Sequence, residues 1–132
     1  MANATAVLTV ANFPAGVDNT QRRQILYGKV AIGTTSQTYV VGGLPLTWLG
    51  IKDASGGTVF PQTTETAPVH VQFDDFSGTG YIFQYNKASN TIQIFESAGS
   101  AAPLAELTAI DIPATVAAAN IAFKAEFIRN NA

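Results

Sequence analysis

The fold is decided by the stretch between residues 69 and 95, which reads VHVQFDDFSGTGYIFQYNKASNTIQIF. Apolar and polar residues alternate there in three runs, at 69–74, 81–86 and 92–95. A period of two places neighbouring side chains on opposite faces of a β-strand. The residues between the last two runs, 86–90, are of the kind that form tight turns. The stretch therefore predicts three strands, of which the last two form a hairpin.

Short strand-like segments bounded by Gly, Pro, Asn and Ser continue along the rest of the chain. Pro113 and the alanines after it indicate a short helical turn near 114–119. Many short strands with turns between them are typical of an all-β antiparallel sandwich or barrel. The length of 132 residues, without linker or repeat, predicts a single domain over 1–132. The further strands are expected at 4–10, 24–32, 37–41, 46–51, 58–60 and 120–129.

The surface of this domain is expected to carry few charges. Only 12% of the residues are charged, against about 25% in ordinary domains. A folded chain of this mass exposes roughly 6,600 Å², which leaves on the order of 400 Å² for each charged side chain. Two interpretations remain open at this point. The surface is either polar and uncharged, or partly covered in an assembly of subunits.

Charge and composition also exclude some partners. The net charge of −2 supplies no basic patch, so we expect no nucleic acid partner. No segment approaches the roughly 18 apolar residues of a membrane span, and the first residues do not resemble a signal peptide. The chain contains no cysteine, which fits assembly in a reducing cytoplasm.

No arrangement of residues in the sequence favours a catalytic or metal site. His70 is the only histidine, and it falls on the polar face of its strand. A nucleophilic triad needs a base, and a zinc site needs several ligands. Asp74 and Asp75 are adjacent, so their side chains point to opposite faces, and turn capping is favoured over a calcium site there. We expect no enzyme activity, no cofactor and no metal.

Four residues are candidates for contact with a partner protein. Arg22 and Arg23 either begin a strand in solvent or bind an acidic patch on another subunit. Trp48, the only tryptophan, is a core residue, an interface anchor or a platform for a sugar ring. Phe76 follows the adjacent aspartates at the end of a predicted strand.

Several stretches, taken in order, resemble small phage structural proteins of the head decoration or cement type. The resemblance implies a jelly-roll-like β-sandwich that forms dimers or trimers on a capsid. The partners would be the major capsid protein and copies of the chain itself. The protein would be made in the host cytoplasm and located on the capsid surface of the virion. The resemblance assigns no contact residues. It rests on NFPAGVD (12–18), YVVGGLPLTW (39–48), GYIFQYN (80–86), AEL (105–107) and FKAEF (123–127).

An alternative function is that of a carbohydrate-binding module or a β-sandwich associated with a phage tail or fibre. Aromatic side chains with an exposed ring face suit the apolar face of a sugar. Trp48, Tyr39 and Tyr81 are the candidates for such a platform.

Overall fold

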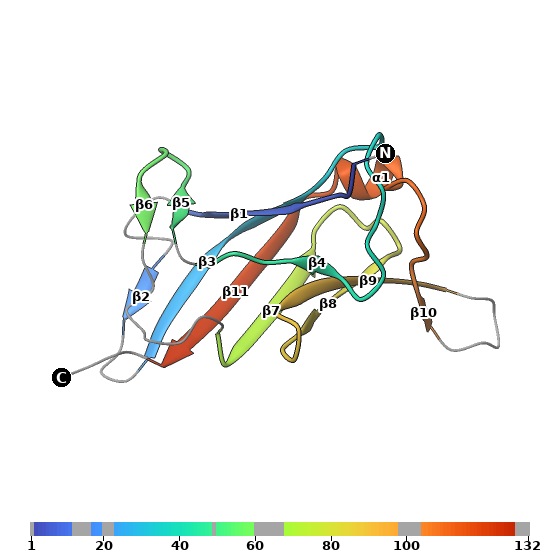
Figure 1. The fold of residues 1–132 in the computed structure, drawn as a ribbon. Helices are drawn as coiled ribbons and strands as arrows, with labels where there is room; N and C mark the ends of the chain where they lie inside the picture. The colour runs from blue at the N-terminus through green and yellow to red at the C-terminus, as the bar shows by residue number, and fades with distance from the viewer. Residues whose placement is uncertain are drawn as a thin grey trace.

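Two β-sheets make up the protein (Figure 1), in a computed structural model that describes residues 2–11, 17–19, 23–48, 50–59, 68–97 and 104–128. The larger sheet has the order β6-β5-β1-β3-β11-β7, with β2 also paired to β3. The smaller sheet has the order β10-β9-β4, with β8 also paired to β9. The larger sheet consists of β1 (Ala6–Val10), β2 (Val17–Asn19), β3 (Arg23–Ile32), β5 (Ile51–Asp53), β6 (Thr58–Val59), β7 (His70–Asp75) and β11 (Ile121–Ile128). The smaller sheet consists of β4 (Leu44–Pro45), β8 (Ile82–Asn86), β9 (Thr91–Ser97) and β10 (Leu104–Glu106).

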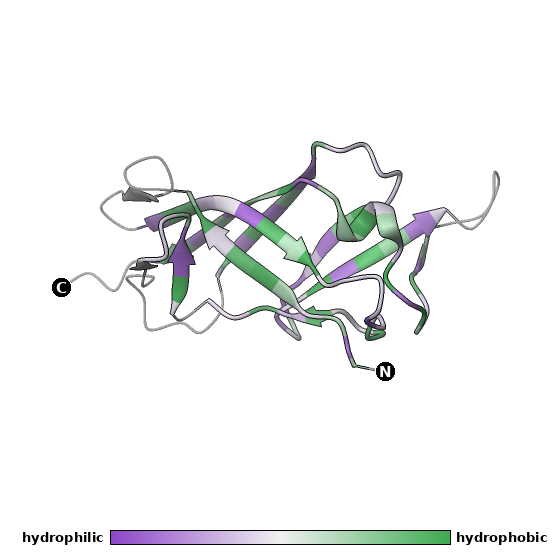
Figure 2. Ribbon diagram, turned by 90° about the horizontal axis from the view of Figure 1, so that it is seen from above, coloured by the Kyte–Doolittle hydropathy of each residue, from purple (hydrophilic) through white to green (hydrophobic). Residues whose placement is uncertain are grey.

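The all-β prediction is confirmed, and the arrangement is that of a sandwich. Neighbouring strands are antiparallel, except that β1 and β5 run parallel. The expected helical turn is α1 (Ala114–Ala117), the one helix of the described residues. Figure 2 shows hydrophobic and hydrophilic residues alternating along the strands, as expected of sheets with one buried face. The jelly-roll topology stays a prediction.

The stretch that decides the fold forms the strands that its alternation predicts. In β7, Val71 is buried and Phe73 is partly buried, whereas His70 and Gln72 are exposed. Strands β8 and β9 pair as a hairpin from Ile82↔Phe95 to Asn86↔Thr91. Their loop ends at Asn90, which has a φ of 54°. Asn tolerates this left-handed backbone better than most residues.

The predicted strand at 37–41 is wrong. The structure has only a single bridge position there, at Thr38, which pairs with both Asn3 and Asp111. The segment forms a single bridge with each of two different parts of the chain, so no ladder forms. The predicted strand at 46–51 is also wrong, because residues 46–48 and 50 lie outside any strand and β5 begins only at Ile51. The short strands β2 and β10 were not predicted.

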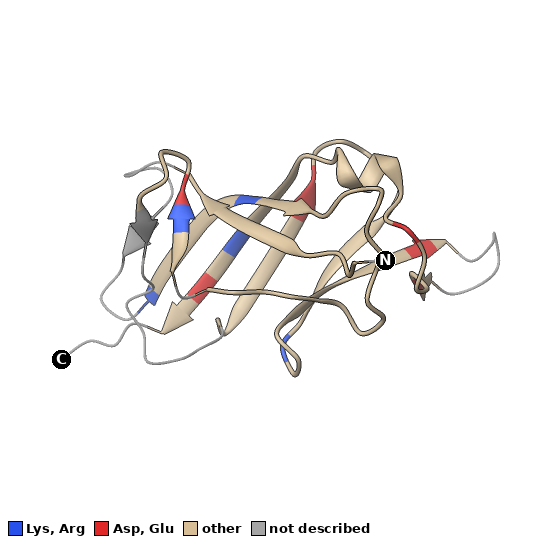
Figure 3. Ribbon diagram, turned by 45° about the horizontal axis from the view of Figure 1, so that its top comes forward, with Lys and Arg blue, Asp and Glu red and all other residues tan. Residues whose placement is uncertain are grey.

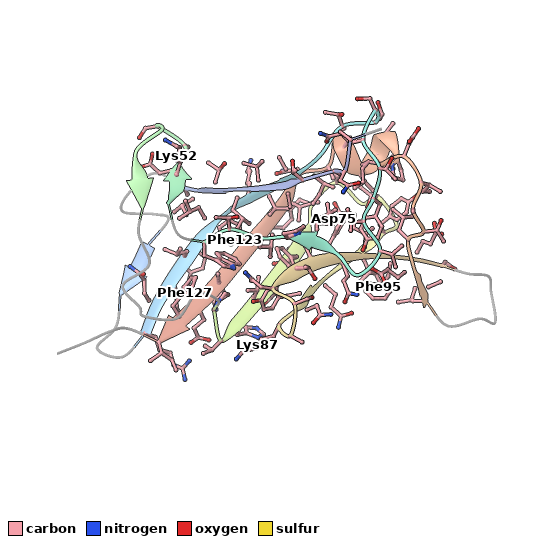
Figure 4. The ribbon with its side chains drawn as sticks, in the orientation of Figure 1. Lys52, Asp75, Lys87, Phe95, Phe123 and Phe127 are labelled. Atoms are coloured by element: carbon pink, nitrogen blue, oxygen red, sulfur yellow. The ribbon has the colours of Figure 1, made fainter. Side chains whose placement is uncertain are left out.

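Trp48 joins the two sheets in the core. Its ring packs edge-on against Phe123 and Phe127, with centroids 5.8 and 5.5 Å away. Both phenylalanines project from β11 in the larger sheet (Figure 4). The indole N–H of Trp48 donates to Oδ1 of Asn90, at 2.9 Å, in the hairpin of the smaller sheet. One side chain thus contacts the larger sheet with its ring and the smaller sheet with its only polar atom.

Asn90 holds this junction through three side-chain hydrogen bonds. Its Oδ1 also accepts from the hydroxyl of Tyr85, at 2.9 Å, and its Nδ2 donates to the carbonyl of Leu46, at 3.0 Å. The backbone carbonyl of Asn90 accepts from the N–H of Leu46 as well. The hairpin loop is therefore tied both to the segment that carries Trp48 and to the core.

We expect Asn90→Gly to lower the free energy of unfolding by about 2 kcal/mol, because it leaves buried polar groups unsatisfied. Glycine keeps the left-handed backbone of the loop, so the loss measures the side chain alone. Asn90→Ala should cost about 1 kcal/mol more, from the strain at positive φ. Urea unfolding of the two variants provides the measurement. If the two variants are equally stable, the left-handed backbone at Asn90 does not disfavour alanine. If Asn90→Gly is as stable as the unaltered chain, the side-chain hydrogen bonds of Asn90 do not contribute to stability.

Candidate functional site

The predicted contact residues do not come together. Arg22 lies outside the described residues. Arg23 pairs with Ile128 at one end of β11, whereas the N–H of Phe76 donates to the carbonyl of Asn120 just before its other end. At about 3.3 Å per residue, the length of β11 separates these two positions by roughly 25 Å. A single interface that contains Arg23 and Phe76 would have to cover the full length of this strand.

Arg23 is exposed and lies 3.4 Å from the carboxylate of Glu126 on β11. Ion pairs of this exposure contribute about 0–1 kcal/mol. Phe76 is 70% exposed in the turn after β7. Arg23 therefore already contacts an acidic group of its own chain, while Phe76 presents an apolar ring to the surroundings.

The core interpretation of Trp48 is confirmed, because its side chain is only 1% exposed. Tyr39 is equally buried, and its hydroxyl donates to Glu106 at 2.7 Å. Burial and this hydrogen bond raise the pKa of Tyr39 above its ordinary value. Neither aromatic ring offers a face to a sugar or to a partner. Tyr81, which is partly buried, is the one remaining member of the proposed sugar platform.

Asp75 caps the turn that follows β7, as the sequence predicts. Its carboxylate accepts from the N–H of Ser77 and from both the N–H and the hydroxyl of Thr79, at 2.6–2.9 Å. Desolvation raises the pKa of Asp75, but these hydrogen bonds outweigh it and hold the pKa below the ordinary value. Asp74 lies on the exposed face of β7, near the amide of Gln72. The two carboxylates have separate environments.

The described residues contain no cluster of metal-ligating side chains. No three side chains of His, Cys, Asp or Glu cluster there in a way that could hold a metal ion. His70 is exposed on β7, within a strand whose other face is apolar. Among the described helices, none has the length and apolar character required to cross a membrane.

The outer face of the smaller sheet is the surface that sequence reasoning missed. Ile82 and Phe95 are directly paired across β8 and β9. Leu104 on β10 is diagonal to Phe95, since Glu106 pairs with Phe95. Ile82 is 46% exposed and Leu104 is 52% exposed. We call Ile82, Phe95 and Leu104 the apolar row.

Most of the charged residues belong to other parts of the fold (Figure 3). The polar neighbours of the apolar row on β8 and β9 are the uncharged pair Gln84 and Gln93. Glu106, the direct cross-strand partner of Phe95, accepts hydrogen bonds from Tyr39 and from the N–H of Gly42. Among the described basic residues, only Lys87 belongs to the smaller sheet's hairpin, and the larger sheet carries Arg23, Lys29, Lys52 and Lys124.

A signal for the apolar row is present in the sequence. In the alternating runs, Ile82 and Phe95 occupy the positions that should face outward, beside Gln84 and Gln93. An apolar residue at an outward position of a clean alternation marks a contact surface or an exposed patch. The pairing of the two residues follows once the hairpin loop is placed. Leu104 has no such signal, because β10 is too short to show a period.

Comparison of the chain with protein-family models, with curated proteins and with solved structures finds no match in any of the three. The fold class therefore rests on the strands and their pairing. The function has to be inferred from the surfaces that these strands present.

Proposed function

We propose that this chain is a non-enzymatic structural protein of a phage particle, a head decoration or cement protein that binds the assembled shell. The apolar row on the outer face of the smaller sheet is the observation that carries the proposal. Its three large apolar side chains lie on one face of the smaller sheet, where a partner could cover them together. Interfaces of this kind have an apolar centre that is depleted in charge.

The composition supports the same proposal. Only 12% of the residues are charged, so charge repulsion between neighbouring molecules is weak. Such a surface suits a subunit that becomes covered by its neighbours. The resemblance to small phage structural proteins supplies the particular assembly, with the major capsid protein and further copies of the chain as partners. A protein that binds only the assembled shell stabilises that shell by mass action.

We expect Phe95→Glu to weaken binding to isolated phage heads at least about thirtyfold, the effect of losing roughly 2 kcal/mol at an interface hot spot. A carboxylate in place of the ring would be buried without a partner in the contact. Co-sedimentation of the purified protein with the heads measures the binding. Thermal unfolding of the free variant verifies that the fold is kept.

Lys124→Glu is the matched control, since Lys124 is exposed on β11 in the other sheet. It should bind like the unaltered chain. If both variants bind equally well, the outer face of the smaller sheet is not the contact surface. If the unaltered protein sediments with no heads at all, the decoration function itself is wrong.

A further inference from the structure

Two sheet edges face each other across a groove. β7 is the last strand of the larger sheet, and β8 pairs only with β9 in the smaller sheet. The two strands are consecutive in the chain, joined by the turn at 76–81, yet they do not pair with each other. The groove between them has a volume of about 580 Å³, within the usual range of ligand-binding clefts.

The backbone of β7 points unused hydrogen-bonding groups toward this groove. Antiparallel strands direct the N–H and C=O of alternate residues to opposite sides. Since the N–H of Phe76 donates to Asn120, the residues Gln72 and Asp74 share its direction and bond to β11. Val71 and Phe73 therefore point their backbone groups away from β11. Within the described part of the chain, no backbone partner accepts from these two N–H groups.

The strand pairing at the other side of the larger sheet gives the same backbone directions for β7. The N–H of Ala11 donates to the carbonyl of Tyr27, so the backbone of Tyr27 faces β1. Gly28, the next residue, faces β11 and pairs with Phe123. Ala122 and Lys124 then face β7, opposite Asp74 and Gln72. The hydrogen bond of Phe76 and that of Ala11 thus lead to the same result. The backbone groups of Val71 and Phe73 point to the free edge of β7.

The backbone of β8 forms the second wall. The carbonyl of Ile94 on β9 accepts from the N–H of Leu107, away from β8. Gln93 and Phe95 therefore bond to β8, through Gln84 and Ile82. It follows that Phe83 and Tyr85 direct their backbone groups away from β9. Both walls of the groove thus present backbone donors and acceptors.

The side chains of the groove combine an apolar lining with positive charge. Apolar and aromatic groups come from Val71, Phe73, Phe83 and Tyr85. Lys87 lies near the start of β7 (Figure 4). Besides Lys87, the polar side chains that line the groove are His70, Gln72 and Gln84, so no carboxylate is among the lining residues.

We propose that this groove binds an extended acidic segment of a partner protein as an added strand on the edge of β7. Strand addition uses the backbone groups of Val71 and Phe73 for affinity and the apolar lining for alternate side chains. Lys87 selects an acidic residue, because the lining contains no carboxylate to neutralise its charge. The site is separate from the apolar row and does not depend on the proposed binding to a phage head.

The probe is a capped peptide of sequence Glu-Thr-Val-Thr-Val-Thr-Glu, titrated into the isotope-labelled full chain and followed by NMR. Its addition should shift the amide signals of Val71 and Phe73 and slow their hydrogen exchange. The same peptide with Lys at both ends should bind about tenfold more weakly, since its charge opposes that of Lys87. A version with methylated backbone nitrogens should not slow the exchange, because it cannot complete a strand ladder.

Lys87→Glu should reverse the preference, so that the Lys peptide binds more tightly than the Glu peptide. Lys52→Glu is the matched control on β5, from which β1, β3 and β11 separate β7, and it should leave both affinities unchanged. Absence of any shift at Val71 and Phe73 overturns the proposal, as does equal binding of the two peptides. Protection of the same amides by increasing protein concentration alone also overturns it, because the occupant is then a second copy of the chain. Failure here leaves the result with phage heads untouched, since that experiment alters Phe95.

Discussion

Gly28→Ala is expected to lower the free energy of unfolding by more than about 3 kcal/mol, beyond the usual cost of overpacking. Gly28 lies in the middle of β3, between β1 and β11. A Cβ atom at this position would lie 2.0 Å from the carbonyl oxygen of Thr9 and 2.8 Å from Cα of Val10. These are backbone atoms of the neighbouring strand, so no rotamer change can make room. The close approach of two backbones requires glycine here.

The effect should appear as a fall in Tm of at least about 10 °C, at the 3–5 °C per kcal/mol expected for this chain length. Ala31→Ser is the matched control, because it also adds one heavy atom to β3, at an exposed position. Its stability should change by no more than about 0.5 kcal/mol. If Gly28→Ala expresses only as insoluble protein, refolding from urea at low temperature still gives the midpoint. A variant as stable as the original would refute the close contact of β1 with β3.

Trp48→Ala should cost about 3–5 kcal/mol, the range for removing a large buried aromatic side chain. The substitution removes the ring from between Phe123 and Phe127, and it removes one of the two donors to Oδ1 of Asn90. Because Trp48 contacts both sheets, its loss weakens the packing between them as well as the local core. Urea unfolding followed by far-UV circular dichroism measures the effect.

Trp48→Phe separates the two contributions. It keeps most of the apolar contact and loses the indole N–H, so we expect a cost of about 1–2 kcal/mol. Combining it with Asn90→Gly should give less than the sum of the two single effects, since both remove the same hydrogen bond. Strict additivity would contradict a direct interaction between the two side chains.

The fold class follows from the sequence because alternation is a local property. Residues 81–86 and 92–95 alternate without interruption, and their loop fixes which residues face each other. The segment at 37–41 also alternates weakly, but its backbone bonds go to Ala2 and Ala4 on one side and to Ile110 and Ile112 on the other. Whether an extended segment forms a ladder depends on what lies beside it, and that is decided by distant parts of the chain. The same reason explains why the short strands β2 and β10 were not predicted.

The surfaces were predictable only in part. Asp75 was assigned to a turn from its neighbours alone, because Asp capping is local. The apolar row needed the register of three strands, and Leu104 enters it only through the pairing of β10 with β9. The groove at β7 depends on the side to which each residue of the larger sheet directs its backbone N–H and C=O. A single sequence does not show these directions, because they follow from the pairing of strands that are distant in the chain.

The position of β3 in the larger sheet also bears on how the protein is made. β3 ends at Ile32, whereas β11, which covers one of its two sides, begins only at Ile121. During translation the first strands leave the ribosome long before that partner exists. Until then the nascent chain presents an open strand edge with an apolar face, the kind of edge that pairs with other chains. Synthesis of β11 thus closes this edge, and termination before Ile121 should yield inclusion bodies instead of a smaller folded protein.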